Sequence, residues 1–129
     1  MCGDKNNCHE NNCLAKVLEK IILLQRTENN QETGCNKPFL GNLTTLANTR
    51  PINLYSCCTN KLWEMPYNYN SQTGTSSFFR IENINENCAT FRILIKNDSV
   101  YTATNNFFII NLNCISTIKC LADTSISNL

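Results

Sequence analysis

The spacing of apolar residues changes once along the chain, and this change sets the fold class. Between Cys13 and Arg26 the apolar residues recur at intervals of three and four, which is the pattern of one buried helical face. Beyond Phe39 the apolar segments are short, rich in Ile, Phe, Tyr and Thr, and bounded by Asn, Gly, Asp and Ser. We therefore predict an α+β, mainly β protein with a single short N-terminal helix. The residues of its apolar face are Leu14, Val17, Leu18, Ile21 and Ile22.

The β-rich part is expected to form antiparallel sheets. Phe91, Ile93 and Ile95 share one parity, with Arg92 and Lys96 on the other, which predicts a strand with one buried face. Turn residues at 96–99 and 105–106 indicate a meander over 88–113. Regular structure is hard to place between Tyr55 and Ser77, so we expect a long, aromatic partner-contact loop there. The predicted architecture is an antiparallel β-sandwich or barrel of about six or seven strands. Candidate strands are 38–41, 51–57, 77–84, 88–96, 100–104, 107–115 and 116–121.

One domain is the expected organisation for 129 residues. Residues 1–12 are polar and read as a flexible, cysteine-bearing N-terminal arm, with a single helix-plus-β domain over 13–129. This first segment lacks the apolar core of a secretory signal, and no run approaches the roughly 20 apolar residues of a membrane span. We therefore expect neither export by a signal peptide nor a membrane partner.

The charges nearly cancel, with 11 Lys plus Arg against 10 Asp plus Glu. No large basic field is available to hold nucleic acid, so no nucleic-acid partner is expected. A near-neutral surface also lacks the self-repulsion that keeps monomers apart, which permits association.

The nine cysteines pose the main chemical question, because no secretory signal points to an oxidising compartment. The count is odd, which implies a remaining thiol or a bond to another chain. Three explanations are open: metal ligation, redox chemistry, or oxidation after the protein has left a reducing cytosol.

Metal ligation has one candidate site. Cys2, Cys8, His9 and Cys13 offer a Cys/His zinc set, which makes a zinc-stabilised cytosolic module the alternative function. The spacing is loose and no CxxC occurs in the chain, so we predict no metal and no cofactor.

The sequence contains no recognisable set of catalytic residues, and we predict that the protein is not an enzyme. His9 is the only histidine, and it lies in the polar arm without an orienting partner. Cys13 stands at the start of the predicted helix, but it lacks the resolving cysteine of a disulfide oxidoreductase. Only four glycines are present, and they form no phosphate loop.

The cysteines divide by their surroundings. Those of the polar arm are suited to reach another molecule, and those in strands of alternating apolar residues are expected to be internal. Ile110, Leu112 and Ile118 share parity with two of the strand cysteines, so an unbroken strand would bury them on one face. Candidates for intermolecular disulfides are Cys2, Cys8 and Cys13, with Cys35, Cys57 and Cys58 as mixed cases, and candidates for internal or buried thiols are Cys88, Cys114 and Cys120.

Six segments, which together span most of the chain, carry a resemblance to a known family: Cys35–Gly41, Asn48–Tyr55, Phe78–Glu82, Asn87–Leu94, Ile110–Cys114 and Ile118–Leu121. They resemble the CotY/CotZ/ExsY family of spore coat and exosporium proteins, and the similarity covers nearly the whole chain. The chain departs from this family in having Ser116 near a position where relatives carry a further cysteine, and in being shorter through 96–106.

The resemblance implies a structural protein made in the mother cell cytoplasm. It implies self-assembly into a cysteine cross-linked, paracrystalline layer of the spore coat or exosporium, with other copies of the chain and other coat proteins as partners. A cyclic homo-oligomer, with a hexamer as one possibility, is the expected building unit. Thiols that stay reduced during synthesis and oxidise after assembly would account for both the cysteine count and the lack of a signal.

Overall fold

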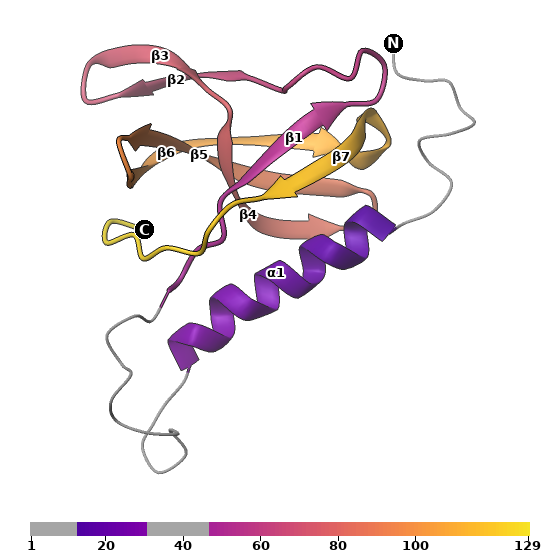
Figure 1. The fold of residues 1–129 in the computed structure, drawn as a ribbon, viewed down its shortest axis with the longest axis horizontal. Helices are drawn as coiled ribbons and strands as arrows, with labels where there is room; N and C mark the ends of the chain where they lie inside the picture. Colours follow the sequence, from indigo (N-terminus) through magenta and orange to yellow (C-terminus); the bar gives the residue numbers. More distant parts are fainter. Residues whose placement is uncertain (1–12, 31–46) are drawn as a thin grey trace.

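The computed structural model describes residues 13–30 and 47–129, which form one α-helix and seven strands (Figure 1). Cys2, Cys8, His9, Cys35 and the candidate strand 38–41 lie outside these residues. The described part is mainly β with a single helix, as the sequence predicts.

Helix α1 runs over Cys13–Asn30, four residues beyond its predicted end. Leu18, Ile21 and Ile22 are buried, and they belong to the same core as residues of the sheet. Gln25 also anchors the helix: its side-chain amide donates to the carbonyl of Ile81 at 3.0 Å and accepts from the backbone N–H of Arg50 at 3.1 Å. The apolar face of α1 therefore packs on the sheet of its own chain.

The strands form two antiparallel sheets. The larger has five strands in the order β6-β5-β4-β1-β7, and the smaller is the hairpin β2-β3. Antiparallel pairing is confirmed, whereas no closed barrel forms among the described strands. The strand bounds are β1 Ile52–Ser56, β2 Met65–Tyr69, β3 Gln72–Ser76, β4 Phe78–Asn85, β5 Cys88–Asn97, β6 Val100–Asn111 and β7 Ile115–Cys120.

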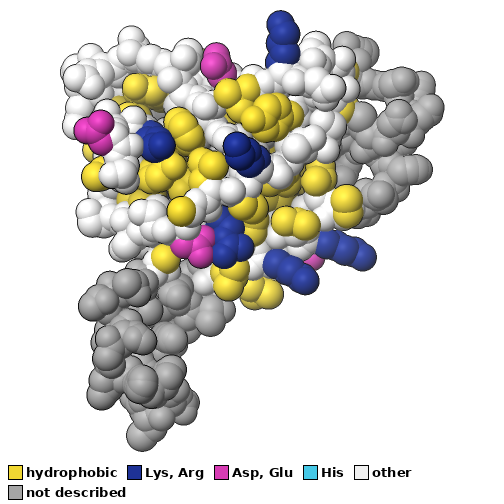
Figure 2. All heavy atoms as spheres, viewed as in Figure 1, with side chains coloured by type: hydrophobic (Ala, Val, Ile, Leu, Met, Phe, Trp, Pro, Cys, Tyr) yellow, Lys and Arg dark blue, Asp and Glu magenta, His cyan; other side chains and the backbone are white. Residues whose placement is uncertain are grey.

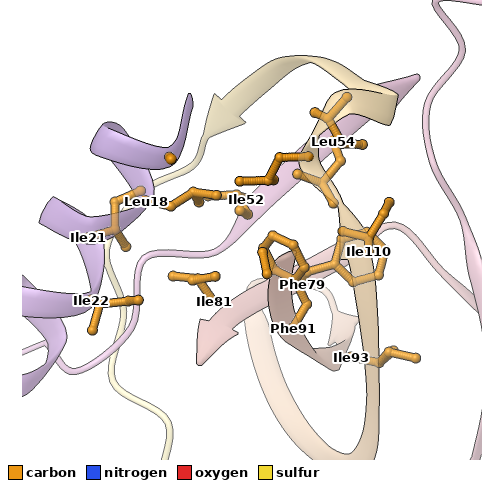
Figure 3. Packing of buried hydrophobic residues seen from close by; sticks show 14 residues of the cluster. Leu18, Ile21, Ile22, Ile52, Leu54, Phe79, Ile81, Phe91, Ile93 and Ile110 are labelled. Atoms are coloured by element: carbon orange, nitrogen blue, oxygen red, sulfur yellow. The ribbon is translucent and has the colours of Figure 1, made fainter. Parts of the chain in front are cut away.

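The main core lies between α1 and one face of the five-stranded sheet (Figure 3). Phe79, Phe91 and Phe108 form its aromatic centre, with ring centroids 5.0–6.2 Å apart. Phe79 and Phe91 are fully buried, and removing each of these side chains from water stabilises the fold by about 1.5–3 kcal/mol. The core contains no described cysteine.

The opposite face of the sheet carries a polar network. Arg80 and Arg92 lie directly opposite each other on β4 and β5, and Glu82 accepts hydrogen bonds from both, at 2.8 and 3.1 Å. Arg80 also donates to the hydroxyl of Thr49 and to the carbonyl of Asn48. The network thus balances the charges of two partly buried arginines, and it links the segment before β1 to the sheet through hydrogen bonds.

The C-terminal segment covers part of this same face. Ile126 packs with Leu94 and Ala103 in a second, smaller apolar cluster. Arg50 donates two hydrogen bonds to Asp123, at 2.6 and 2.9 Å, and these bonds hold the pKa of that carboxyl below its usual range.

Strand β6 is continuous where the sequence predicts a turn at Asn105-Asn106. The register of β5 and β6 is irregular between Arg92 and Leu94, so the extra residues form a bulge and the strand continues. The Thr104 hydroxyl donates to the carbonyl of Ile93 at 2.7 Å and accepts from the N–H of Asn106 at 3.0 Å. The Thr104 side chain thus provides hydrogen-bond partners for backbone groups that have no partner on the adjacent strand at the bulge.

The hairpin β2-β3 occupies the region that the sequence suggests is an irregular loop. Asn70 and Ser71 have φ values of 51° and 69°, as the type I′ turn of a two-residue hairpin requires. Trp63, Met65 and Tyr67 pack against the main core. These side chains therefore stabilise the fold of the chain itself.

Among the described residues, no helix is long and apolar enough to cross a membrane.

Packing of α1 on its own sheet predicts unequal effects at two adjacent positions. Leu18→Ala should lower the free energy of unfolding by about 2–5 kcal/mol, because Leu18 is 0% exposed. The matched change Val17→Ala should cost about 1 kcal/mol or less, because Val17 is 41% exposed. Urea unfolding of the reduced protein measures both, and equal losses would contradict this packing.

Candidate functional site at the cysteine-bearing end of the sheet

Three chain connections meet at one end of the five-stranded sheet. They are the turn between β4 and β5, the 3-10 turn Leu112–Cys114 between β6 and β7, and the segment that follows β1. The N–H of Leu112 donates to the carbonyl of Asn87 at 2.8 Å, and the N–H of Cys57 donates to the carbonyl of Cys114 at 2.9 Å. These bonds bring together connections that are far apart in the sequence.

Four cysteines lie on these connections or at the strand end beside them, and we refer to this region as the cysteine-bearing end: Cys57, Cys58, Cys88 and Cys114. Helix α1, whose first residue is Cys13, begins on the same side of the molecule (Figure 1). Cys120 is at the other end of the sheet, because it pairs with Ile52 at the start of β1. Described cysteines are thus present at both ends of the strands.

Side-chain amides hold the cysteine-bearing end in place. Asn87 donates to the side chain of Asn113 at 2.8 Å and to that of Asn111 at 3.3 Å. Asn111 also caps the 3-10 turn by accepting from the N–H of Asn113 at 2.9 Å. These neutral contacts link two connections without a charged group, which agrees with the small net charge of the chain.

Exposure separates the described cysteines into two groups. Cys13, Cys58, Cys88 and Cys120 are exposed, and Cys57 and Cys114 are half-buried. None of them belongs to either apolar cluster. The fold of the described residues therefore uses no cysteine as a core residue.

Of the three cysteines that the sequence suggests are internal or buried, Cys88 and Cys120 are exposed and Cys114 is half-buried. Cys88 pairs with Asn111 and alternates with the buried Ala89, so it lies on the face away from the main core. Cys120 does share the face of Ile52, but β7 is an edge strand and no described element covers its last residue.

Cys114 is half-buried, and an interruption of the strand explains its position. The 3-10 turn interrupts the strand that the sequence suggests is continuous, and this shifts the alternation by one residue. Ile115 takes the buried position in β7, and Cys114 is left half-buried. The parity of apolar residues was a correct signal for Ile110, Leu112 and the partly buried Ile118, but it does not hold for Cys114 within the turn.

The predicted zinc set is not assembled by the described residues. Cys13 is exposed at the start of α1, and Cys2, Cys8 and His9 lie outside the described part. Among residues 13–30 and 47–129, no three His, Cys, Asp or Glu side chains gather into a group that could hold a metal ion.

A family model described as Spore coat protein Z matches residues 1–105. The chain belongs to this spore coat protein family. The match confirms the spore coat part of the predicted resemblance and points to a structural role in the spore coat. No curated protein and no solved structure shows significant similarity to the chain.

The matched residues of this coat protein end within β6. Cys13, Cys57, Cys58 and Cys88 fall inside the match, whereas Cys114 and Cys120 lie beyond it. The cysteine-bearing end thus combines thiols from the family-matched part with one from the C-terminal strands.

The exposure pattern predicts the order in which thiols react with iodoacetamide in the folded, reduced coat protein. Cys88 and Cys120 should be alkylated nearly as fast as in urea, and Cys114 severalfold more slowly, because only Cys114 is half-buried. Trypsin separates the three thiols into peptides 81–92, 97–119 and 120–129, so mass spectrometry reads each rate. Protection of Cys88 equal to that of Cys114 would contradict the exposed placement of Cys88.

Proposed function

We propose that this protein is a non-catalytic structural component of the spore coat that self-assembles and is then cross-linked through disulfides. The observation that carries the proposal is the placement of exposed thiols at both ends of the sheet, with Cys88 at one end and Cys120 at the other. Membership of a spore coat family supports the structural role.

The number of reactive thiols on each chain determines how many neighbouring chains it can bind covalently. A chain with one reactive thiol forms only a dimer, whereas a chain with two or more exposed thiols on different sides extends into a network. Cys88 and Cys120 are free thiols in this structure, and their separation along the strands suits links to different neighbours. Neither thiol contributes to the core, so cross-linking either one leaves the packing of the chain intact.

The surface also favours contact between copies. On the face seen in Figure 2, apolar side chains are spread among isolated charged ones, without a large area of a single charge. Edge strand β6 contains no charged residue and exposes Val100, Phe107 and Ile109. Uncharged edge strands associate with other chains more readily than charged ones, although the Asn128 side chain already occupies the backbone N–H and carbonyl of Ala103.

Synthesis and cross-linking are separated in time. In a reducing cytosol the thiols stay reduced while the chain folds and packs into a layer. Later, two thiols on neighbouring copies lose two protons and two electrons to molecular oxygen or to a small disulfide, and one S–S bond forms. Packing places the thiols at high effective concentration, which favours bonds between adjacent copies.

The proposed layer is two-dimensional and consists of cyclic homo-oligomers, with a hexamer as one arrangement, in contact with other coat proteins. Deposition in the coat or in the exosporium is part of this proposal, as is synthesis in the mother cell cytoplasm. Cys2, Cys8 and Cys35 remain candidates for additional intermolecular bonds.

Oxidation of concentrated protein followed by non-reducing gel electrophoresis tests the proposal. The unmodified chain should give a ladder of multimers that reductant collapses to monomer. The double variant Cys88→Ser and Cys120→Ser should form fewer of the largest multimers, because two of the exposed link positions are removed while the other exposed thiols remain. Protein alkylated before oxidation is the control and should stay monomeric.

A monomer band that is unaffected by the omission of reductant would overturn the proposed cross-linking. A ladder that survives alkylation of every thiol would equally contradict it, since the multimers would then owe nothing to disulfides.

A further inference from the structure

We infer that Cys57 and Cys114 form a disulfide within one chain when the protein is oxidised, while the adjacent Cys58 remains directed outward for links between copies. The inference deepens the proposed function and rests on the oxidative use of thiols that it assumes. It assigns different partners to two cysteines that stand side by side in the sequence.

Cys57 and Cys114 each lie one residue beyond the last pair of β1 and β7. Ser56 of β1 pairs with Ile115 of β7, and one further step along this antiparallel pair brings Cys57 to Cys114. The N–H of Cys57 donates to the carbonyl of Cys114 at 2.9 Å, so a backbone hydrogen bond joins the two residues just beyond the last strand pair. Opposite residues joined in this way have Cα atoms about 5.5 Å apart, which falls within the separation that a disulfide requires.

The Cys57 side chain points toward the 3-10 turn that contains Cys114. Its Sγ lies 3.0 Å from the carbonyl oxygen of Asn113, the residue immediately before Cys114. Both cysteines are half-buried, whereas the exposed cysteines of this end face solvent. A bond between them therefore requires side-chain rotation and no separation of strands.

Cys58 is carried away from this contact by the turn that follows β1. The Ser56 hydroxyl accepts from the N–H groups of Cys58 and Thr59, at 3.2 and 3.4 Å, and the Ser56 carbonyl accepts from the N–H of Asn60 at 2.7 Å. Asn60 has a φ of 61°, so the chain reverses direction here. Cys58 is exposed on this turn.

Cys88 is the other described cysteine of this end, and its geometry differs. It lies opposite Asn111 on β6, so its direct cross-strand neighbour carries no thiol. Among the described cysteines, Cys57 and Cys114 alone are joined by a backbone hydrogen bond.

The bond forms by two exchanges with a small disulfide such as oxidised glutathione. The thiolate of one cysteine attacks the small disulfide, forms a mixed disulfide and releases one reduced thiol. The second cysteine thiolate then attacks the mixed disulfide, the S–S bond of the protein forms, and a second reduced thiol leaves. The two protein thiols lose two protons and two electrons, and the small disulfide takes them up.

This bond would tie the end of β1 to the connection between β6 and β7. It closes a long loop, and closure of a long loop stabilises a fold mainly by restricting the unfolded chain. The same bond would hold the turn that carries Cys58 in a fixed position, which prepares this exposed thiol for a link to another copy.

Oxidation at low protein concentration, where bonds within a chain are favoured, tests the inference. The reduced full chain is treated with oxidised glutathione, the monomer is isolated by size-exclusion chromatography, and tryptic peptides are examined by mass spectrometry. The unmodified chain and Cys58→Ser should both show peptide 27–61 linked to peptide 97–119. Their melting temperature should exceed that of the reduced protein by roughly 10 °C.

Cys57→Ser and Cys114→Ser should lose both the linked peptides and the rise in melting temperature. Peptide 27–61 also contains Cys35 and Cys58, so a link that persists in Cys57→Ser overturns the inference. The adjacent Cys58→Ser variant is the matched control, because it removes one thiol from the same peptide and leaves the predicted bond.

The two proposals fail in different ways. A monomer without this link, together with disulfide-linked multimers at high concentration, would overturn the inference and leave the proposed function standing. A linked monomer that forms no multimers at high concentration would support the inference and contradict the cross-linked assembly.

Discussion

Burial of one face of α1 against the five-stranded sheet is the interaction on which the rest of the structure depends. Leu18 and Ile21 of the helix share one core with Phe79 and Phe91 of the sheet, and Gln25 fixes the helix to both β4 and the segment before β1. No described cysteine takes part in this core. Apolar packing therefore supports the fold of the described residues, and their thiols are left for other uses.

This division between core and thiols suits the proposed folding of this coat protein under reducing conditions. The exposed thiols of Cys88 and Cys120 lie on different sides of the sheet, where they suit bonds to neighbouring copies. The half-buried pair Cys57 and Cys114 suits a bond within the chain, because a backbone hydrogen bond already joins the two residues. In a layer with both kinds of bond, the bonds between copies would hold neighbouring chains together, and the bond within each chain would stabilise its fold.

Sequence reasoning succeeded where a local pattern had a single physical explanation. The period of apolar residues located α1, and alternation located β5, because both patterns follow directly from backbone geometry. It failed where tertiary contacts decide the outcome. The Thr104 hydroxyl replaces the bonds lost at the β6 bulge, so Asn105-Asn106 forms no turn there, and the hairpin β2-β3 gains its order by packing on the core. The exposure of Cys120 depends on strand order, which no local pattern reveals.

Electron microscopy of the recombinant full chain, purified under reducing conditions and then oxidised, tests the central claim most directly. The account predicts extended sheets or tubes with a regular repeat, whose resistance to dispersal by denaturant is lost when a reductant is added. A monodisperse monomer after oxidation at high concentration would contradict the proposal that this coat protein self-assembles into a cross-linked layer.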